Sequence, residues 1–162
     1  MNRTRTILLT AALALAVTAC GSSSSSSAAN NDKAFVLNEW VITPPAHALH
    51  AGKVTITATN IGGETHELVI VRADDAAALP TKADGSVDED AIPEADKPGE
   101  IPDIAAGKTV TKSLDLAAGR YVAICNLVDA MGRGAMMSGD AGGGAAGHVH
   151  FHLGMRTSFT VS

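Results

Sequence analysis

The most informative segment of the chain reads Gly119-Arg-Tyr-Val-Ala-Ile-Cys125-Asn126. In an extended chain, alternate side chains point to opposite faces. Tyr121 and Cys125 therefore share one face, and Val122 and Ile124 share the other. Apolar residues on both faces, following a glycine that favours a turn, predict a buried strand. This strand ends at a thiol.

Several other segments show the pattern of a strand. The clearest is residues 53–60, in which Val54 and Ile56 alternate with threonines. Residues 66–71 are largely apolar after His66, which predicts a strand buried on both faces. The remaining predicted strands are residues 34–42, 108–116 and 156–161. At least six short strands without alternating helices indicate an all-β fold, an antiparallel β-sandwich with Greek-key connections.

Residues 73–106 interrupt this pattern. They show no periodicity, and they mix acidic residues with the prolines Pro80, Pro93, Pro98 and Pro102. We expect a long surface excursion, and we expect any helix of the chain to be a short one within it, near residues 75–79.

The N-terminus has the layout of a secretory signal. Arg3 and Arg5 precede an apolar run at residues 7–17, which is too short to span a bilayer comfortably. The segment Val17-Thr-Ala-Cys20 resembles the lipobox of bacterial lipoproteins, whose cysteine is lipidated and becomes the mature N-terminus. The resemblance implies lipidation of Cys20 and an extracytoplasmic protein held at the cell membrane by its lipid.

These features divide the chain into three parts. Residues 1–19 are predicted to be a lipoprotein signal peptide, and residues 20–33 a lipidated cysteine followed by a serine-rich tether. Residues 34–162 are long enough for one core and too short for two ordinary domains.

Charge and cysteine content exclude some classes of function. The formal net charge is −5, which argues against a nucleic-acid partner because such partners require a basic face. If lipid occupies Cys20, Cys125 is the one remaining cysteine and no intramolecular disulfide can form. A lone exported thiol is readily explained by a metal.

Side chains that bind metals accompany this thiol. The segment His148-Val-His-Phe-His-Leu-Gly-Met155 supplies three imidazoles and a thioether, and Thr59-Asn-Ile-Gly-Gly-Glu-Thr-His66 ends in a further imidazole. Copper prefers thiolate, thioether and imidazole ligands over harder ones. Residue type does not select among the three histidines of the first segment, because they share a face if that segment is extended.

These three segments resemble the characteristic patches of the cupredoxins, the plastocyanin-like blue-copper proteins. The resemblance covers about residues 36–161 and implies a β-sandwich that binds one copper ion. It also implies that His66, Cys125 and His150 are the close ligands and that Met155 is the long axial ligand.

The preference for His150 rests on its spacing to Met155, which matches the pattern of the family. His152 and His148 are the alternatives. The chain departs from the family in the interval between cysteine and histidine, because residues 126–149 intervene where most members have a few residues.

Further side chains are candidates for a role near the metal. An asparagine follows the first histidine in familiar plastocyanins, whereas Glu67 stands there in this chain, so Asn60 and Asn126 are the candidates for bracing the site. The long interval also contains possible auxiliary contacts for Cu(I), namely Met131, Met136 and Met137.

Together these observations predict a monomeric one-electron carrier that contains copper. The alternative is a copper-delivery or storage protein that binds Cu(I) through the methionine- and histidine-rich loop. An enzyme is not expected, because four filled coordination positions leave none open for a substrate. The acidic charge predicts a redox partner with a basic docking patch.

Overall fold

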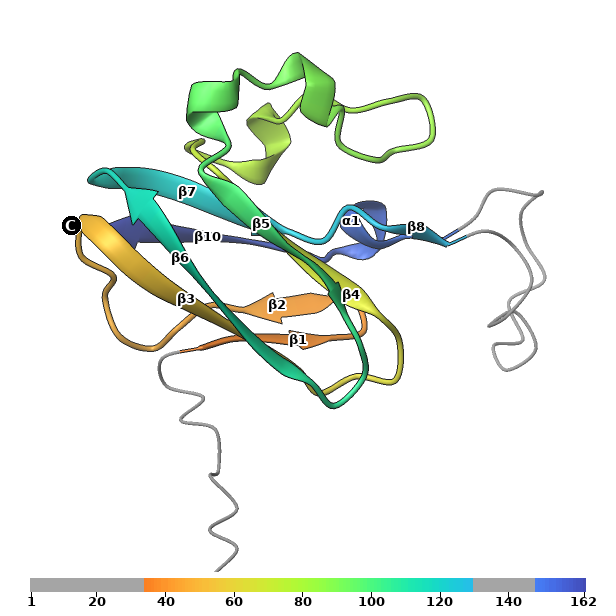
Figure 1. Ribbon diagram of the computed structural model, residues 1–162. Coiled ribbons are helices and arrows are strands. Elements are labelled where there is room, and N and C mark those ends of the chain that lie inside the picture. The colour runs from red at the N-terminus through yellow and green to blue at the C-terminus, as the bar shows by residue number, and fades with distance from the viewer. Residues whose placement is uncertain (1–33, 130–147) are drawn as a thin grey trace, which may run out of the picture.

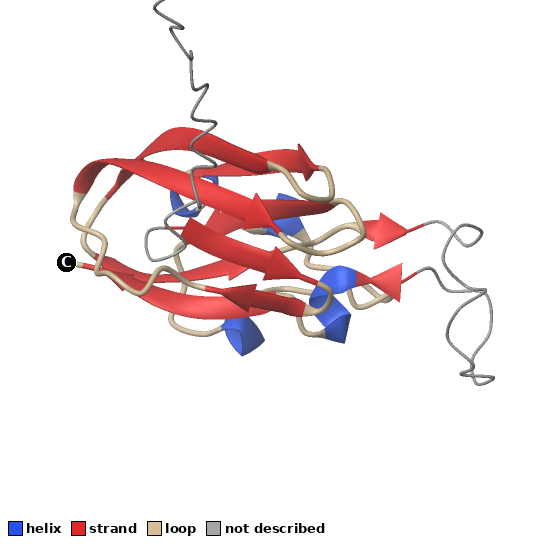
Figure 2. Ribbon diagram, turned by 90° about the horizontal axis from the view of Figure 1, so that it is seen from below, coloured by secondary structure: helices blue, strands red, loops and turns tan. Residues whose placement is uncertain are grey.

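The computed structural model describes residues 34–129 and 148–162. Two four-stranded sheets pack face to face within it (Figures 1 and 2), with strand orders β2-β1-β3-β6 and β10-β7-β4-β5. The strands of the first sheet are β1 (Ala34–Asn38), β2 (Val41–Thr43), β3 (Gly52–Asn60) and β6 (Thr109–Leu116). The strands of the second are β4 (His66–Val71), β5 (Gly99–Ile104), β7 (Gly119–Ile124) and β10 (Arg156–Val161). The predicted all-β sandwich is confirmed.

The first sheet departs from the prediction in two ways. β1 runs parallel to β3, with Ala34 opposite Thr57, whereas the other strand pairs of the two sheets are antiparallel. The strand predicted at residues 34–42 is in fact a hairpin of β1 and β2. Trp40 lies in its turn with a φ of 64°, a left-handed conformation that is uncommon for a bulky side chain.

The core fills the space between the sheets. Buried side chains from both sheets, among them Phe35 and Leu68, form one cluster that also contains Cys125 and Met155. Phe159 packs against the edge of the Phe35 ring, with 5.1 Å between ring centroids. Two of the four candidate metal ligands, Cys125 and Met155, therefore belong to this core.

The excursion covers the outer face of the second sheet. Its three short 3₁₀ turns are η2 (Ala76–Ala78), η3 (Glu89–Ala91) and η4 (Glu94–Asp96). Apolar side chains of the excursion, including Leu79 and Val87, pack against side chains of β4 and β7. This cover accounts for burial of β4 on both faces, as its apolar sequence predicts. β5, which contains Pro102, was not predicted; it lies at the edge of the sheet, where proline is tolerated.

A small additional ribbon and one helical turn lie at one end of the sandwich, opposite the C-terminus (Figure 1). β8 (Val128–Asp129) pairs with β9 (His148–Val149), and α1 (His150–Leu153) follows directly. The prediction that any short helix would lie in residues 73–106 is therefore wrong for α1, which lies at His150–Leu153. Gly154, with a φ of 120°, ends α1 in a conformation that suits glycine. No helix of the described ranges is long and apolar enough to cross a membrane.

Candidate metal centre

Three side chains meet at the end of the sandwich that carries α1. His66 is the first residue of β4, and Cys125 directly follows β7. Because β4 and β7 are antiparallel neighbours, the start of one lies beside the end of the other. His150 begins α1, and its N–H donates to the Leu127 carbonyl at 3.0 Å, which holds it close to Cys125.

The three ligand atoms form a compact triangle. His150 Nδ1 lies 3.2 Å from His66 Nδ1 and 3.3 Å from Cys125 Sγ, and the third side, from Cys125 Sγ to His66 Nδ1, is 3.9 Å. The circumcentre of a triangle with sides of 3.2, 3.3 and 3.9 Å lies about 2.0 Å from each corner, near the length of metal bonds to imidazole and thiolate. All three residues are 0% exposed. The cluster therefore fits one metal ion.

The other two histidines of the segment point elsewhere. His148 is exposed on β9, and His152 is exposed on α1. The three histidines would share a face only in an extended segment, and that condition is not met because the chain turns into a helix at His150. Of the three, His150 is the one that the fold brings to Cys125 and His66.

Comparisons with known proteins concern the fold of the chain. No model of a protein family matches the chain, and no curated protein matches it. Among solved structures, the chain is similar to dithionite-reduced auracyanin from the photosynthetic bacterium Roseiflexus castenholzii, with a TM-score of 0.51 and 20% identity over 79% of this chain and 94% of that one. It also matches auracyanin B, with a TM-score of 0.41 and 22% identity over 77% of this chain and 82% of that one.

Auracyanin is a blue-copper protein of the cupredoxin class. The chain has the cupredoxin fold. At 20% identity the likeness concerns the fold alone. One soft thiolate and two imidazoles suit copper in both oxidation states, because sulfur favours Cu(I) and nitrogen favours Cu(II). The cluster of His66, Cys125 and His150 thus fits one copper ion.

Met155 is tied to two of these residues through its backbone. Its N–H donates to the His150 carbonyl at 3.0 Å, and its own carbonyl accepts from the Cys125 N–H at 3.0 Å. The side chain is 0% exposed and belongs to the same buried cluster as Cys125. Met155 is therefore held beside the triangle by a rigid frame.

A β-bulge shapes the hydrogen bonding of the thiol. The register between β4 and β5 shifts between His66 and Leu68, so Glu67 lies in an irregularity of the ladder. The Glu67 N–H donates to Cys125 Sγ at 3.4 Å, and Glu67 Oε1 accepts from the Asn126 N–H at 2.9 Å. Glu67 therefore braces the two ligand-bearing segments against each other, in the position where familiar plastocyanins carry asparagine.

The two predicted bracing asparagines have other partners. Asn60 is fully buried and donates to the carbonyls of Glu64 and Ile104 while accepting from the Gly62 N–H, which fixes the turn before His66.

Asn126 bonds to the excursion through both ends of its side-chain amide. It accepts from the Val87 N–H at 2.6 Å, and it donates to the Val87 carbonyl and to Glu89 Oε1. It therefore fastens the excursion to the segment that carries Cys125.

Burial is the largest cause of the pKa shifts of Cys125, His66 and Glu67. Burial raises the pKa of the Cys125 thiol to about 11, although the N–H groups of Glu67 and Leu127 oppose the shift. Burial also lowers the pKa of His66, and the neighbouring His150 adds to this effect. Burial raises the pKa of Glu67 to about 7. A cation in the triangle would supply the positive charge that a buried thiolate needs.

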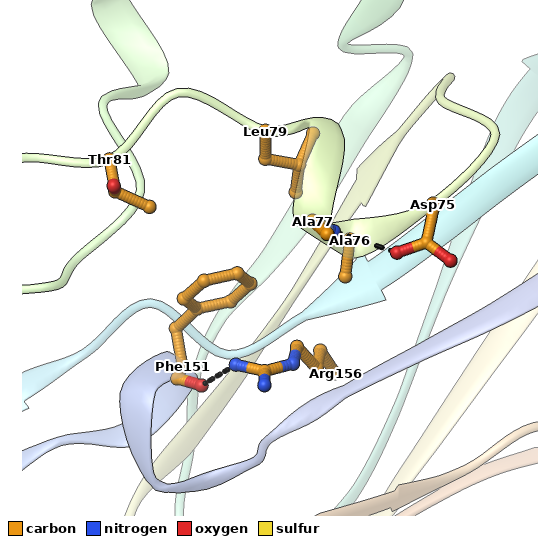
Figure 3. A pocket seen from close by; sticks show the side chains of 7 residues that line it. All are labelled: Asp75, Ala76, Ala77, Leu79, Thr81, Phe151 and Arg156. Atoms are coloured by element: carbon orange, nitrogen blue, oxygen red, sulfur yellow. Dashed lines mark hydrogen bonds between the residues drawn. The ribbon is translucent and has the colours of Figure 1, made fainter.

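A hollow of about 270 Å³ lies between the segment around η2 and the residues Phe151 and Arg156 (Figure 3). It is lined by Asp75, Ala76, Ala77, Leu79, Thr81, Phe151 and Arg156, so it contains none of the three cluster residues. Arg156 lies beside Phe151, donates to the Phe151 carbonyl at 2.8 Å and places its guanidinium 4.9 Å from the centre of the Phe151 ring. These contacts anchor α1, and with it His150.

The outer nitrogens of both histidines face carboxylates, which the sequence did not indicate. His150 Nε2 lies 2.9 Å from Asp129 Oδ2 and 3.8 Å from Glu64 Oε2. Within residues 34–129 and 148–162, His66 Nε2 is buried without a hydrogen-bond partner, and the carboxylate of Glu39 lies 3.8 Å away. Glu64 stands two residues before His66 in the sequence, so its carboxylate could have been predicted to lie near the cluster. Glu39 and Asp129 come from other segments of the chain and could not.

Trp40 was also missed. Its ring meets the His150 ring edge-on, with 5.1 Å between centroids. The remaining predicted residues, Cys20 and the three methionines Met131, Met136 and Met137, lie outside the described residues.

Proposed function

We propose that this protein carries single electrons by means of one copper ion, bound by His66, Cys125 and His150 with Met155 as the axial ligand. The observation that carries the proposal is the buried triangle of two Nδ1 atoms and one Sγ, whose centre suits a metal ion. A copper ion in this position supplies the one-electron couple.

The residues around the triangle perform three tasks. His66 and Cys125 sit at the ends of paired strands, so the ligands move little when the charge of the centre changes. Full burial of the three ligands excludes water. The Glu67 N–H donates to the sulfur and stabilises negative charge on it.

The same burial favours an electron carrier over an oxidase. A mononuclear oxidase needs an open coordination position that a substrate can reach. Here the three close ligands are fully buried, and Met155 is buried in the same core cluster as Cys125. We therefore propose a carrier, not an enzyme.

A copper-delivery or storage role is the second candidate. Its support is the group of methionines within residues 131–137, since thioethers are suitable ligands for Cu(I). A delivery protein exchanges its metal through accessible ligands, whereas the three ligands described here are 0% exposed. The electron carrier is accordingly the preferred function.

We also propose that the protein is anchored by lipid on Cys20 outside the cytoplasm, that it is a monomer and that its redox partner is basic. The resemblance of residues 17–20 to a lipobox supports the anchor, and the net charge of −5 supports the basic partner. Cys20→Ala should release the protein from the membrane fraction. If that variant remained membrane-bound, the lipid anchor would be wrong.

A visible spectrum tests the copper function directly. The full-length chain in detergent is titrated with Cu(II), reduced with ascorbate and reoxidised with ferricyanide. We expect an intense thiolate-to-copper band at one equivalent that bleaches and returns, and we expect Cys125→Ser to lack it. A colourless protein that still binds Cu(I) tightly would replace the carrier with the delivery or storage role.

A further inference from the structure

The hydrogen bond between His150 and Asp129 decides which ring nitrogen carries the proton. A neutral imidazole has one N–H, and a carboxylate can only accept from it. His150 Nε2 lies 2.9 Å from Asp129 Oδ2, a geometry in which a neutral His150 would carry its proton on Nε2 and its lone pair on Nδ1. Nδ1 is the atom that faces His66 and Cys125.

The β8–β9 ribbon is what brings this carboxylate to the histidine. Asp129 is the residue of β8 that stands opposite His148 of β9, two residues before His150. The His150 N–H in turn donates to the Leu127 carbonyl, two residues before Asp129. The ribbon thus fixes both the backbone of His150 and the partner of its outer nitrogen.

A second carboxylate reinforces the charge at the same place. Glu64 Oε2 lies 3.8 Å from His150 Nε2, and that oxygen is buried with no hydrogen-bond partner in the part of the chain that the structure describes. The oxidised centre carries one more positive charge than the reduced centre. Negative charge beside the ligand therefore favours the oxidised state.

We propose that Asp129 is a positioning residue, which holds His150 in the tautomer that presents Nδ1 to the metal and which, with Glu64, favours the oxidised centre. The inference rests on the proposed copper function for its redox part. Its tautomer part concerns the protein alone. Outer partners of metal-binding histidines commonly act in this way, and their loss typically costs about 10–100-fold in metal affinity.

Three variants of the full-length chain separate hydrogen bond from charge. Asp129→Ala removes both, Asp129→Asn keeps an acceptor but removes the charge, and Glu64→Gln removes the second charge. Asp115→Asn is the matched control. Asp115 is an exposed carboxylate on β6, where it stands opposite Lys53 of β3 and away from the cluster.

The first readout is the tautomer of His150, measured by nitrogen NMR on the protein without metal. We expect the proton on Nε2 in the wild type, Asp129→Asn, Glu64→Gln and Asp115→Asn. In Asp129→Ala the Nε2–H form should lose its dominance. A dominant Nε2–H form in Asp129→Ala would overturn the positioning role, whatever the protein does with copper.

The second readout is the reduction potential of the copper-loaded protein. A tenfold loss of affinity for Cu(II) at constant affinity for Cu(I) corresponds to a rise of about 59 mV. We expect a rise in Asp129→Ala, Asp129→Asn and Glu64→Gln, and none in Asp115→Asn. Potentials of the three site variants equal to that of Asp115→Asn would overturn the charge effect. A wild type without the visible band would instead refute the copper function, and the NMR measurement would still decide the role of Asp129.

Discussion

Asn60 offers a quantitative test of how the fold supports the ligand His66. Its side chain makes three hydrogen bonds to backbone groups, to the Glu64 carbonyl at 2.7 Å, to the Ile104 carbonyl at 2.8 Å and from the Gly62 N–H at 2.9 Å. The residue is 0% exposed, so water does not replace these partners without cost. We expect Asn60→Ala to destabilise the protein strongly.

The size of the effect follows from these three bonds. At about 1 kcal/mol for each net hydrogen bond, with a further contribution from backbone groups left unpaired, the free energy of unfolding should fall by about 3–4 kcal/mol. That is a large part of the usual stability of a domain, about 5–15 kcal/mol. The melting temperature should drop by about 10–15 °C. Because the lost bonds fix the turn before His66, affinity for copper should fall as well.

Urea denaturation without metal is the assay, and Asn38→Ala is the control. Asn38 is an exposed asparagine at the end of β1, so its truncation should cost less than about 0.5 kcal/mol. If Asn60→Ala lost less than about 1 kcal/mol, or no more than Asn38→Ala, the bonds of Asn60 would not support the turn. Asn60 would then have no part in positioning His66.

Three further predictions concern the ligands themselves. Met155→Leu should keep the visible band but raise the reduction potential in voltammetry, because an axial donor that favours Cu(II) is lost; an unchanged potential would show that Met155 is not axial. His148→Ala and His152→Ala should leave the absorption spectrum unchanged, since both side chains are exposed; loss of the band in either would contradict the choice of His150. Since burial raises the pKa of Cys125 to about 11, the thiol is protonated at neutral pH, and Zn(II) binding near pH 7 should release about one proton, measured in weakly buffered solution. Cys125→Ser should release none.

The strands were predictable where the order of apolar and polar residues reflects which faces of the strand are buried. β3 alternates because one of its faces is buried, and β4 is apolar throughout because the excursion covers the outer face of its sheet. β5 escaped prediction because Pro102 and its acidic neighbours resemble a loop. Its place at the edge of the sheet, where the ladder needs fewer N–H groups, is not visible from the sequence.

The ligand candidates were predictable from residue type and from resemblance, but their surroundings were not. His150 was preferred for its spacing to Met155, whereas its surroundings depend on the helical turn of α1. Glu39 and Trp40 come from the β1–β2 turn, far from the ligands in the chain. Nothing local to that turn indicates that Trp40 packs on His150 or that Glu39 faces His66.

The long interval between Cys125 and His150 can be reconciled with a compact centre. The backbone bond from the His150 N–H to the Leu127 carbonyl, followed by the pairing of β8 with β9, closes the chain only two residues beyond Cys125. Cys125 and His150 are therefore held close together by this hydrogen bond and this strand pairing, and the number of residues between β8 and β9 does not change that. Loop closure adds only a slowly growing entropic cost as length increases. The long interval between Cys125 and His150 is consequently compatible with an undistorted triangle of ligand atoms. The β8–β9 ribbon within that interval also places Asp129 against His150.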